Sequence, residues 1–416
     1  MLAPFLAAAL LAGPGGAQPM RSLDLEQAYK LALARSEELA QRGETVVRLE
    51  ARIFEMGSYL KPQAYLAAAQ TIQDLPPGGA TSSIPRERNQ AQIQVHQTLF
   101  TGLREYLAVR QARAQKASAQ YLLQRARQLL YQDVVRAYLD LLAVRHEVGI
   151  RQAILATTDD RIKELRQRQR LGRSRKSEVL AVESQQAQDA AQLETARGAE
   201  AVAQLQLRFL TGWEEDVVPA ELPAVSAAAV DAALAEARGR PDVEAARRDR
   251  DAAGYPASIA SRQRWPVANM DGNYYLHRQS PYDKVYWDVA FSLSLPLYTG
   301  GIIGAQVREA EALRRSADQA LSLALRRAEL EVRAAGRDLD SALTIVAALE
   351  KAAKLAADNA QAQSDDYRSG LVTNLDVLGS LSALQQTRLK LDAARIGAFW
   401  SRTQLDVAAG LPGARL

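Results

Sequence analysis

Histidines and acidic side chains are the residues of this chain best suited to catalysis or metal binding. Their spacing matches no known catalytic or metal-binding pattern. His96, His146 and His277 lie far apart, and no two of them have metal-ligand spacing. The acidic runs Asp159-Asp160 and Glu214-Glu215-Asp216 are more simply solvated charge, on a helical face and in a connector. The sequence has no Gly-x-Ser-x-Gly, His-Glu-x-x-His or phosphate-loop motif. We therefore expect no enzyme, no bound metal and no cofactor.

Charge and cysteine content exclude further classes of protein. The net charge of +4 is small for 416 residues, so there is no electrostatic case for nucleic-acid binding. The chain has no Cys, which excludes disulfides, thiol catalysis, cysteine metal sites and a lipid anchor on an N-terminal cysteine. Residues 1–17 are small and apolar and predict a secretory signal, although they contain no Lys or Arg. The alternatives are a disordered apolar N-terminus and a misplaced start codon.

One acidic residue, Asp376, stands at a turn that occurs twice. The two turns read Tyr367-Arg-Ser-Gly370-Leu-Val-Thr373-Asn-Leu-Asp376-Val-Leu378 and Gln169-Arg-Leu-Gly172-Arg-Ser-Arg-Lys-Ser-Glu178-Val-Leu180. Gly370 falls on Gly172 and Asp376 falls on Glu178. The same offset places Tyr298-Thr299-Gly300 on Phe100-Thr101-Gly102. A match at a fixed interval indicates an internal duplication. We therefore predict a first repeat at 18–212, a connector at 213–227 and a second repeat at 228–411.

Each predicted repeat contains an opening helical segment, two strands, a long helix, a turn and a returning helix. Period-two alternation predicts strands at about 63–74, 90–100, 265–277 and 285–297. Helical periodicity predicts long helices at 101–170 and 304–369, tip turns at 172 and 370, and return helices at 173–210 and 373–408. The first long helix has a heptad seam, Leu130, Val134, Ala137, Leu141, Val144 and Val148, beside a second stripe, Tyr131, Val135, Tyr138 and Leu142. Two adjacent stripes predict helical neighbours on both sides.

The last predicted strand has one face without charge, formed by Val285, Trp287, Val289, Phe291, Leu293 and Leu295. The strands have about 10–13 residues, the length of tilted strands that span a bilayer. A sheet in lipid must close on itself, because an open edge leaves backbone groups unpaired. Four strands are too few to close a barrel, so several chains must contribute. The pattern predicts a tube rooted in a membrane, with the amphipathic helices in water. The alternative is a soluble hairpin on a coiled coil.

The order of these elements resembles the TolC-like outer-membrane efflux duct family. The motifs that carry the resemblance are the repeated turn, Gln97-Thr-Leu-Phe-Thr-Gly102, Leu295-Pro-Leu-Tyr-Thr-Gly-Gly301 and Arg240-Pro-Asp-Val243. The resemblance implies a mainly α fold with a transmembrane β-barrel, in which a homotrimer forms a twelve-stranded barrel continuous with a twelve-helix periplasmic α-barrel. It implies a place in the outer membrane of a Gram-negative-type bacterium, extending into the periplasm. The predicted apolar face would then contact lipid through Val285, Trp287, Val289, Phe291 and Leu293.

The resemblance also implies an export duct without chemistry of its own, in a tripartite efflux or type I secretion system. A periplasmic adaptor protein would dock at the tips and link the duct indirectly to an inner-membrane transporter. The residues implied in docking are Gly172, Arg173, Ser174, Arg175, Gly370, Leu371 and Val372. The basic residues there equally suit a solvated turn. The alternative function is a secreted coiled-coil scaffold or adhesin-like protein without a pore, which should be soluble without detergent.

The family resemblance implies a periplasmic constriction formed by Asp376, Glu178 and Tyr367. Three copies of Asp376 near a threefold axis would crowd like charges and raise the carboxylate pKa. Two positions depart from the family pattern: Gly379 replaces a second acid, and Val372 replaces a basic residue that can hold the closed state. Closure by that ion pair is therefore not expected.

Asp376 has a second interpretation that is compatible with the first. Thr373-x-x-Asp376 has the form of an N-terminal capping box, with Asp in place of the usual Glu. A carboxylate in the first turn also favours the helix dipole. Capping alone and capping combined with a place at the constriction both remain open.

Overall fold

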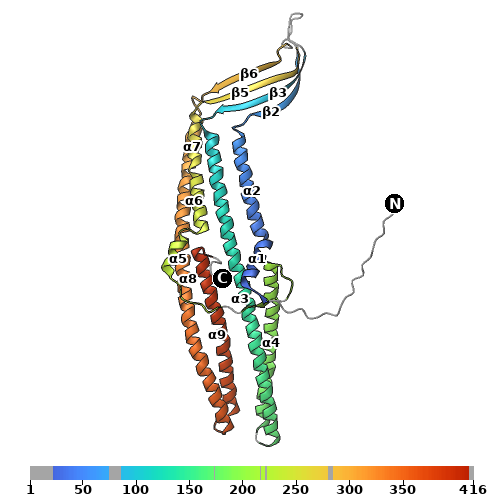
Figure 1. Ribbon diagram of the computed structural model, residues 1–416, viewed down its shortest axis with the longest axis vertical. Helices are drawn as coiled ribbons and strands as arrows, with labels where there is room; N and C mark the ends of the chain where they lie inside the picture. The colour runs from blue at the N-terminus through green and yellow to red at the C-terminus, as the bar shows by residue number, and fades with distance from the viewer. Residues whose placement is uncertain are drawn as a thin grey trace, which may run out of the picture.

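The chain forms a long shaft of helices with a small sheet at one end (Figure 1). The computed structural model describes residues 22–74, 86–172, 174–215, 217–220, 223–279 and 284–411. The predicted signal sequence at 1–17 lies outside the described residues. Within the described residues, no helix combines the length and the apolar character needed to cross a membrane.

The helices and strands follow the same order twice. The helices are α1 (Leu25–Arg35), α2 (Glu37–Ser58), α3 (Arg104–Arg170), α4 (Lys176–Thr211), α5 (Val230–Ala237), α6 (Pro241–Ala253), α7 (Tyr255–Ser261), η1 (Arg262–Arg264), α8 (Ile302–Arg368) and α9 (Asn374–Ala409). The strands are β1 (Ser22–Leu23), β2 (Gln63–Ile72), β3 (Glu87–Phe100), β4 (Val218–Pro219), β5 (Val267–Arg278) and β6 (Trp287–Ser294). Helices α3 and α8 both have 67 residues, and α4 and α9 both have 36. The predicted duplication is confirmed.

The ends of several elements differ from the predicted bounds for local reasons. Helix α3 begins at Arg104, because Leu103 has a left-handed backbone with φ of 64°. Strand β6 begins at Trp287, so Val285 precedes the strand instead of lying within it. It ends at Ser294, two residues before Pro296, which lacks the N–H that a strand ladder needs. Return helix α4 begins only at Lys176.

The sheet is antiparallel, in the order β2-β3-β5-β6, so β2 and β6 form its two edges. β1 and β4 pair separately as a short parallel bridge near the middle of the shaft. Helix α3 starts directly after β3, and α8 starts shortly after β6. At 1.5 Å per residue, each of these helices extends roughly 100 Å from the sheet.

The hydrophobic core lies around the middle of the shaft, where the short helices cover the long ones (Figure 1). One cluster joins α1, α3 and α4, and a second joins α5, α8 and α9. Both predicted stripes of α3 enter the first cluster: Val134 and Leu141 are fully buried, and so are Val135 and Tyr138. Helix α3 contacts α4 on one side and α9 on the other. The prediction of neighbours on both sides is therefore confirmed.

Candidate functional site

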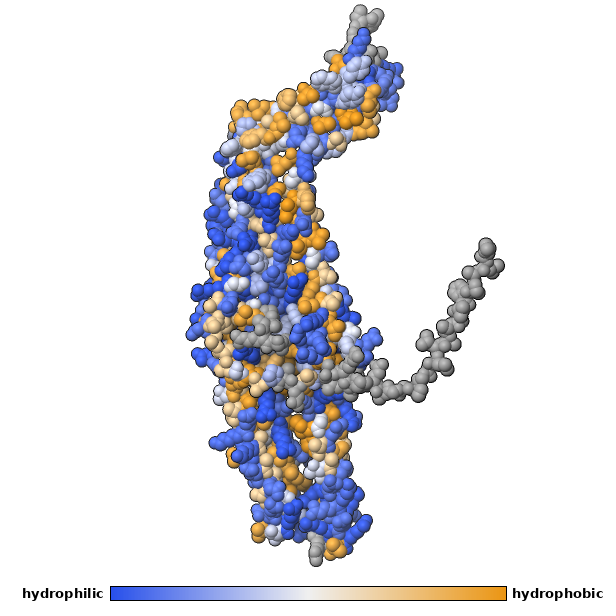
Figure 2. Space-filling model, in the orientation of Figure 1, coloured by the Kyte–Doolittle hydropathy of each residue, from blue (hydrophilic) through white to orange (hydrophobic). Residues whose placement is uncertain are grey.

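One face of the sheet carries a row of apolar and aromatic side chains across its four strands. Cross-strand pairing joins Leu66 to Ile93, Ile93 to Tyr274 and Tyr274 to Trp287 in one row across all four strands. Paired residues in a sheet share a face. The neighbouring positions along β6 on this face are Val289, Phe291 and Leu293, all of them exposed in the single chain. Figure 2 shows the apolar side chains that gather on the sheet.

The opposite face of the sheet is polar and linked by hydrogen bonds. His96 Nδ1 lies 2.6 Å from Asp271 Oδ1. The Asn273 amide donates to Asp288 at 2.9 Å, and the Tyr275 hydroxyl donates to the same carboxylate at 2.6 Å. The two faces thus differ in the way that a wall between lipid and water requires. Both faces of β6 are exposed in one chain, so the lipid-facing assignment stays a prediction.

The far end of the shaft carries two helical turns with matching backbones. Gly172 has φ of 73° and Gly370 has φ of 78°, which are conformations that suit glycine at a helix end. Nothing lies within 4 Å of a Cβ built on either glycine. Glycine is therefore favoured at these positions by the left-handed backbone, and not by a lack of space for a side chain. Leu371 is exposed at the second turn. Among the other predicted docking residues, Arg173 lies outside the described residues.

Asp376 caps α9 through a complete capping box. The backbone N–H and the hydroxyl of Thr373 donate to Asp376 Oδ2 at 2.9 and 2.6 Å. The backbone N–H of Asp376 donates to Thr373 Oγ1 at 3.4 Å. Hydrogen bonds from Thr373 hold the pKa of Asp376 below its usual value, opposite in direction to the like-charge crowding expected between copies. The capping interpretation is confirmed.

Glu178 occupies the equivalent place in the first repeat without the same contacts. Its Oε2 accepts a hydrogen bond from Ser174 Oγ at 2.6 Å. The first residue before α4, Arg175, provides no side-chain cap. Within one chain, Glu178 and Asp376 therefore bind their own turns and not each other. Their place at a constriction stays a prediction.

Arg161 of α3 contacts the second turn, and this contact was not among the predictions from the sequence. Its Nε and Nη2 atoms donate to Asn374 Oδ1 at 3.1 and 2.7 Å. Its guanidinium also lies 4.4 Å from the centre of the Tyr367 ring, and that of Arg168 lies 4.9 Å from the same ring. Glu164 pairs with both arginines, at 3.1 and 2.8 Å. The predicted constriction residue Tyr367 is thus held by cations of the first repeat.

Burial makes the Arg161 contact costly to disrupt. The Arg161 side chain is only 13% exposed, and Asn374 is buried. Removing the arginine would leave the Asn374 carbonyl without its charged donor. The basic partner of this inter-repeat contact comes from the first repeat, whereas the family pattern would place it at the position of Val372. One signal could have suggested it: Arg161 and Arg168 are one heptad apart on α3.

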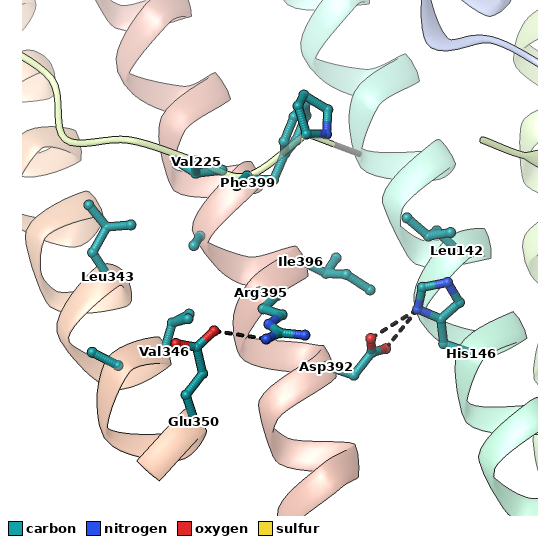
Figure 3. A pocket seen from close by; sticks show the side chains of 14 residues that line it. Leu142, His146, Val225, Leu343, Val346, Glu350, Asp392, Arg395, Ile396 and Phe399 are labelled. Carbon is teal, nitrogen blue, oxygen red and sulfur yellow. Dashed lines mark hydrogen bonds and ion pairs between the residues drawn. The ribbon is translucent and has the colours of Figure 1, made fainter. Parts of the chain in front are cut away.

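A pocket of about 620 Å³ lies between α3, α8 and α9 at mid-shaft (Figure 3). His146 Nδ1 lies 2.9 Å from Asp392 Oδ1, and Arg395 donates to Glu350 at 2.8 Å. The first of these pairs joins α3 of the first repeat to α9 of the second. The charged groups at the pocket are thus paired with each other. No group of three metal-ligating side chains occurs in the part of the chain that the structure describes.

The motif that opens the second repeat is structural. Arg240 is almost completely buried, with Asp242 Oδ1 at 2.6 Å, Glu331 Oε2 at 2.5 Å and the Ala408 carbonyl at 3.2 Å. Burial disfavours the charge of Arg240, but the hydrogen bonds that Arg240 donates to the carboxylates of Asp242 and Glu331 outweigh it and raise the Arg240 pKa. The same arginine lowers the pKa of Asp242 despite burial. This cluster fastens α6 to α8 and α9.

Sequence comparisons identify relatives. The chain matches the family described as "Outer membrane efflux protein" over residues 28–213 and 227–411, once for each repeat. Outer membrane protein TolC of Vibrio cholerae is 29% identical over 174 residues, which cover 40% of this chain and 40% of that protein. Outer membrane efflux protein BepC of Brucella suis is 24% identical over 316 residues, which cover 72% of this chain and 67% of BepC. The match to TolC thus spans less than half of either protein.

Solved structures share the fold along nearly the whole chain. The crystal structure of VceC from Vibrio cholerae has a TM-score of 0.81 at 20% identity, covering 93% of this chain and 96% of that one. CusC has a TM-score of 0.83 at 16% identity, covering 94% and 93%. The predicted fold class is confirmed. With both repeats matched, the chain belongs to the outer membrane efflux protein family and is a protein of the outer membrane that extends into the periplasm.

Proposed function

We propose that this chain is one protomer of a trimeric export duct that carries substrates across the periplasm and the outer membrane. One observation supports the proposal most: a four-stranded sheet with two open edges continues directly into helices of 67 residues. Edges in lipid need partners, because unpaired backbone groups are costly there. Three copies, with β6 of each pairing with β2 of the next, would close the barrel.

Closure of the barrel would give the two faces of the sheet their roles. The row of Leu66, Ile93, Tyr274 and Trp287 would face lipid, and the face of His96, Asp271 and Asp288 would line water. The helices would continue this water-filled path through the periplasm. Such a duct needs no catalytic residues, because it acts by enclosing a path for its substrates.

The tips would meet the other parts of an efflux or type I secretion system. We expect a periplasmic adaptor protein to dock at the two turns, where Leu371 and Leu171 are exposed apolar residues beside the reversing helices. An inner-membrane transporter would connect through that adaptor. At rest, the contact of Arg161 with Tyr367 and Asn374 would hold the two hairpins of one chain together, near a constriction formed by three copies of Asp376 and Glu178.

The scaffold alternative is less favoured. A coiled-coil scaffold in water would gain nothing from the uncharged row on the sheet, and Phe291 on that face is 73% exposed. Large apolar patches on a soluble protein promote association and aggregation. Membership of the outer membrane efflux protein family also favours the duct.

Membrane fractionation with measurement of the oligomer mass tests the proposal. The duct should fractionate with the outer membrane, require detergent for extraction, and have the mass of three chains of 45.4 kDa each. A matched culture that expresses a soluble periplasmic protein provides the fractionation control. Full solubility without detergent would overturn the proposal in favour of the scaffold.

A further inference from the structure

The polar face of the sheet contains one pair of side chains whose net charge depends on a histidine. His96 of β3 lies opposite Asp271 of β5, on the two central strands of the sheet. His96 Nδ1 is 2.6 Å from Asp271 Oδ1, and the two side chains are 43% and 48% exposed. Water and small ions can therefore reach the pair. Histidine is the side chain whose charge ordinarily changes between about pH 5 and 8.

His96 is the only side chain that forms an ion pair with Asp271 in the part of the chain that the structure describes. While His96 is neutral, the pair carries the single negative charge of the carboxylate. When His96 is protonated, the pair carries no net charge. Three copies around a closed barrel would therefore change from three negative charges to none, without any movement of the backbone.

Asp288, the carboxylate of β6 on the same face, has different surroundings. It lies opposite Asn273, whose amide donates to Asp288 at 2.9 Å, and it accepts a second hydrogen bond from the Tyr275 hydroxyl at 2.6 Å. The guanidinium of Arg278 lies 4.2 Å from the centre of the Tyr275 ring. Asp288 thus has a permanent cation nearby and no histidine partner. Its contribution to the charge of this face should not change between about pH 5 and 8.

The other polar groups around His96 also keep their charge in this range of pH. On β2, Gln63 lies opposite His96, Tyr65 follows on the same face, and Lys61 precedes the strand. Arg88 shares the face of His96 but lies roughly 27 Å away along β3. Lysine, arginine and tyrosine do not ordinarily titrate between about pH 5 and 8. They therefore offset the charge of the face by a constant amount, whereas protonation of His96 changes it.

The other two histidines of the chain lie elsewhere. His277 of β5 is paired with Ala91, which shares a face with Ile93 and not with His96. His146 lies at mid-shaft, with its Nδ1 atom 2.9 Å from Asp392 Oδ1. Within the sheet, His277 therefore provides a matched control for His96, because it belongs to the same sheet but to the opposite face.

We infer that the His96–Asp271 pair is an acid-sensitive determinant of ion selectivity in the barrel, which favours cations near neutral pH and loses this preference as His96 is protonated. The inference rests on the proposed function, since it needs a barrel whose polar face lines water. A ring of carboxylates in a pore attracts cations. A positive charge 2.6 Å from each carboxylate largely cancels that attraction. The pair is roughly 100 Å from the tips, so it acts independently of Asp376.

Reversal potentials of the full-length trimer in planar bilayers under a KCl gradient test the inference. The cation-to-anion permeability ratio of the unaltered protein should fall by about twofold or more between about pH 8 and 5. His96→Gln should remove most of this fall, because glutamine can still donate to Asp271 but carries no charge. Asp271→Asn should lower the ratio at the higher pH by a similar factor. His277→Gln is the control and should retain the fall of the unaltered protein.

The two variants of the pair should thus change selectivity in opposite senses. At the lower pH, His96→Gln should prefer cations more than the unaltered protein does, and at the higher pH Asp271→Asn should prefer them less. A general distortion of the barrel would not produce this opposite pattern. Should His96→Gln fail to assemble, His96→Asn makes the same comparison, because asparagine is also uncharged.

Each other outcome counts against a defined claim. An equal fall in His96→Gln and in the unaltered protein would overturn the inference, and so would loss of the fall in His277→Gln. An unchanged ratio in Asp271→Asn at the higher pH would also overturn it. Conductance steps whose permeability ratio does not depend on pH would refute the role of the pair and leave the duct intact. Absence of conductance steps from the fully inserted, unaltered trimer would instead refute the proposed function.

Discussion

The tips of the two repeats share a backbone and differ in their side chains. Both turns place a glycine at a left-handed φ, 73° at Gly172 and 78° at Gly370, between helices of equal length in the two repeats. The second tip has a capping box and offers an acceptor and an aromatic ring, Asn374 and Tyr367. The first repeat offers two cations of α3, Arg161 and Arg168. Duplication thus preserved the scaffold, while the side chains diverged into complementary halves of one contact.

The strands show the same divergence. With the offset of 198, Phe291 of β6 falls on Ile93 of β3, and Trp287 falls on Asn89. The second repeat therefore has the more apolar version of the face. Ile93 is 39% exposed, whereas Phe291 is 73% exposed at the edge of the sheet. Equivalent substitutions in the two repeats can therefore distinguish side chains that both repeats need for folding from side chains that have a role in one repeat only.

The largest effect is expected from charge on the apolar face. Phe291→Arg should impair trimer assembly, because an arginine facing lipid near the bilayer midplane costs about 2–4 kcal/mol. Ile93→Arg should impair assembly similarly, since it lies on the same face. Ser292→Arg, on the polar face, should be milder. The yield of detergent-stable trimer in the outer-membrane fraction measures all three, and equal losses on both faces would refute the predicted orientation.

The next effect is expected from the contact between the tips. Arg161→Ala should remove a charged donor from the buried Asn374 carbonyl and cost about 1.5–3 kcal/mol of the closed arrangement. Channels with this change should open more often and conduct more in planar bilayers. Arg166→Ala is the control, because Arg166 pairs with Glu183 inside the first hairpin only and is more exposed. If the two variants have the same conductance, Arg161 does not stabilise the closed channel.

A smaller effect is expected from the glycines. Gly172→Ala and Gly370→Ala should each lower stability by about 1–2 kcal/mol, because an L-residue is strained in the left-handed region. Neither site has atoms within 4 Å of the new Cβ, so the two losses should agree. Thermal unfolding of the extracted oligomer measures them. A loss at one tip alone would show that the scaffolds of the repeats are not equivalent.

The smallest effect on folding is expected from Asp376→Asn. The folded-state pKa of Asp376 is lowered by Thr373, so the cap contributes above the pKa of the unfolded chain and is lost as pH falls through the folded pKa. The variant should therefore melt slightly lower at neutral pH and equally at acid pH. If Asp376 also lines the constriction, the variant should lose cation selectivity and block by multivalent cations. Unchanged selectivity would mean that Asp376 is a helix cap only. The variant Glu178→Gln tests in the same way whether the first tip contributes to the constriction.

Local patterns in the sequence predicted the fold well. The duplicated turn, the alternation in the strands and the adjacent stripes of Val134 and Val135 all depend on residues within a few turns of each other. The capping box could be read from Thr373 and Asp376 for the same reason. Boundaries were less accurate where one backbone conformation decided them, as at Leu103 before α3.

Contacts between the repeats could not be predicted in this way. Arg161 and Asn374 are 213 positions apart, and His146 and Asp392 are 246 apart. The hydrophobic period determines which face of a helix is buried, but not which polar residue meets which across two hairpins. The heptad spacing of Arg161 and Arg168 places both on one face of α3, but it does not identify Asn374 as their partner. These contacts appear only when α3 and α9 are placed side by side.

Single-channel recording of the extracted trimer in planar bilayers tests the central claim most directly. We expect discrete conductance steps from the unaltered protein, and larger or longer steps from Arg161→Ala at the same protein density. Phe291→Arg, which should not assemble, provides the blank. Fully inserted trimers without any conductance steps, in both the unaltered chain and Arg161→Ala, would contradict the claim that this protein is a duct.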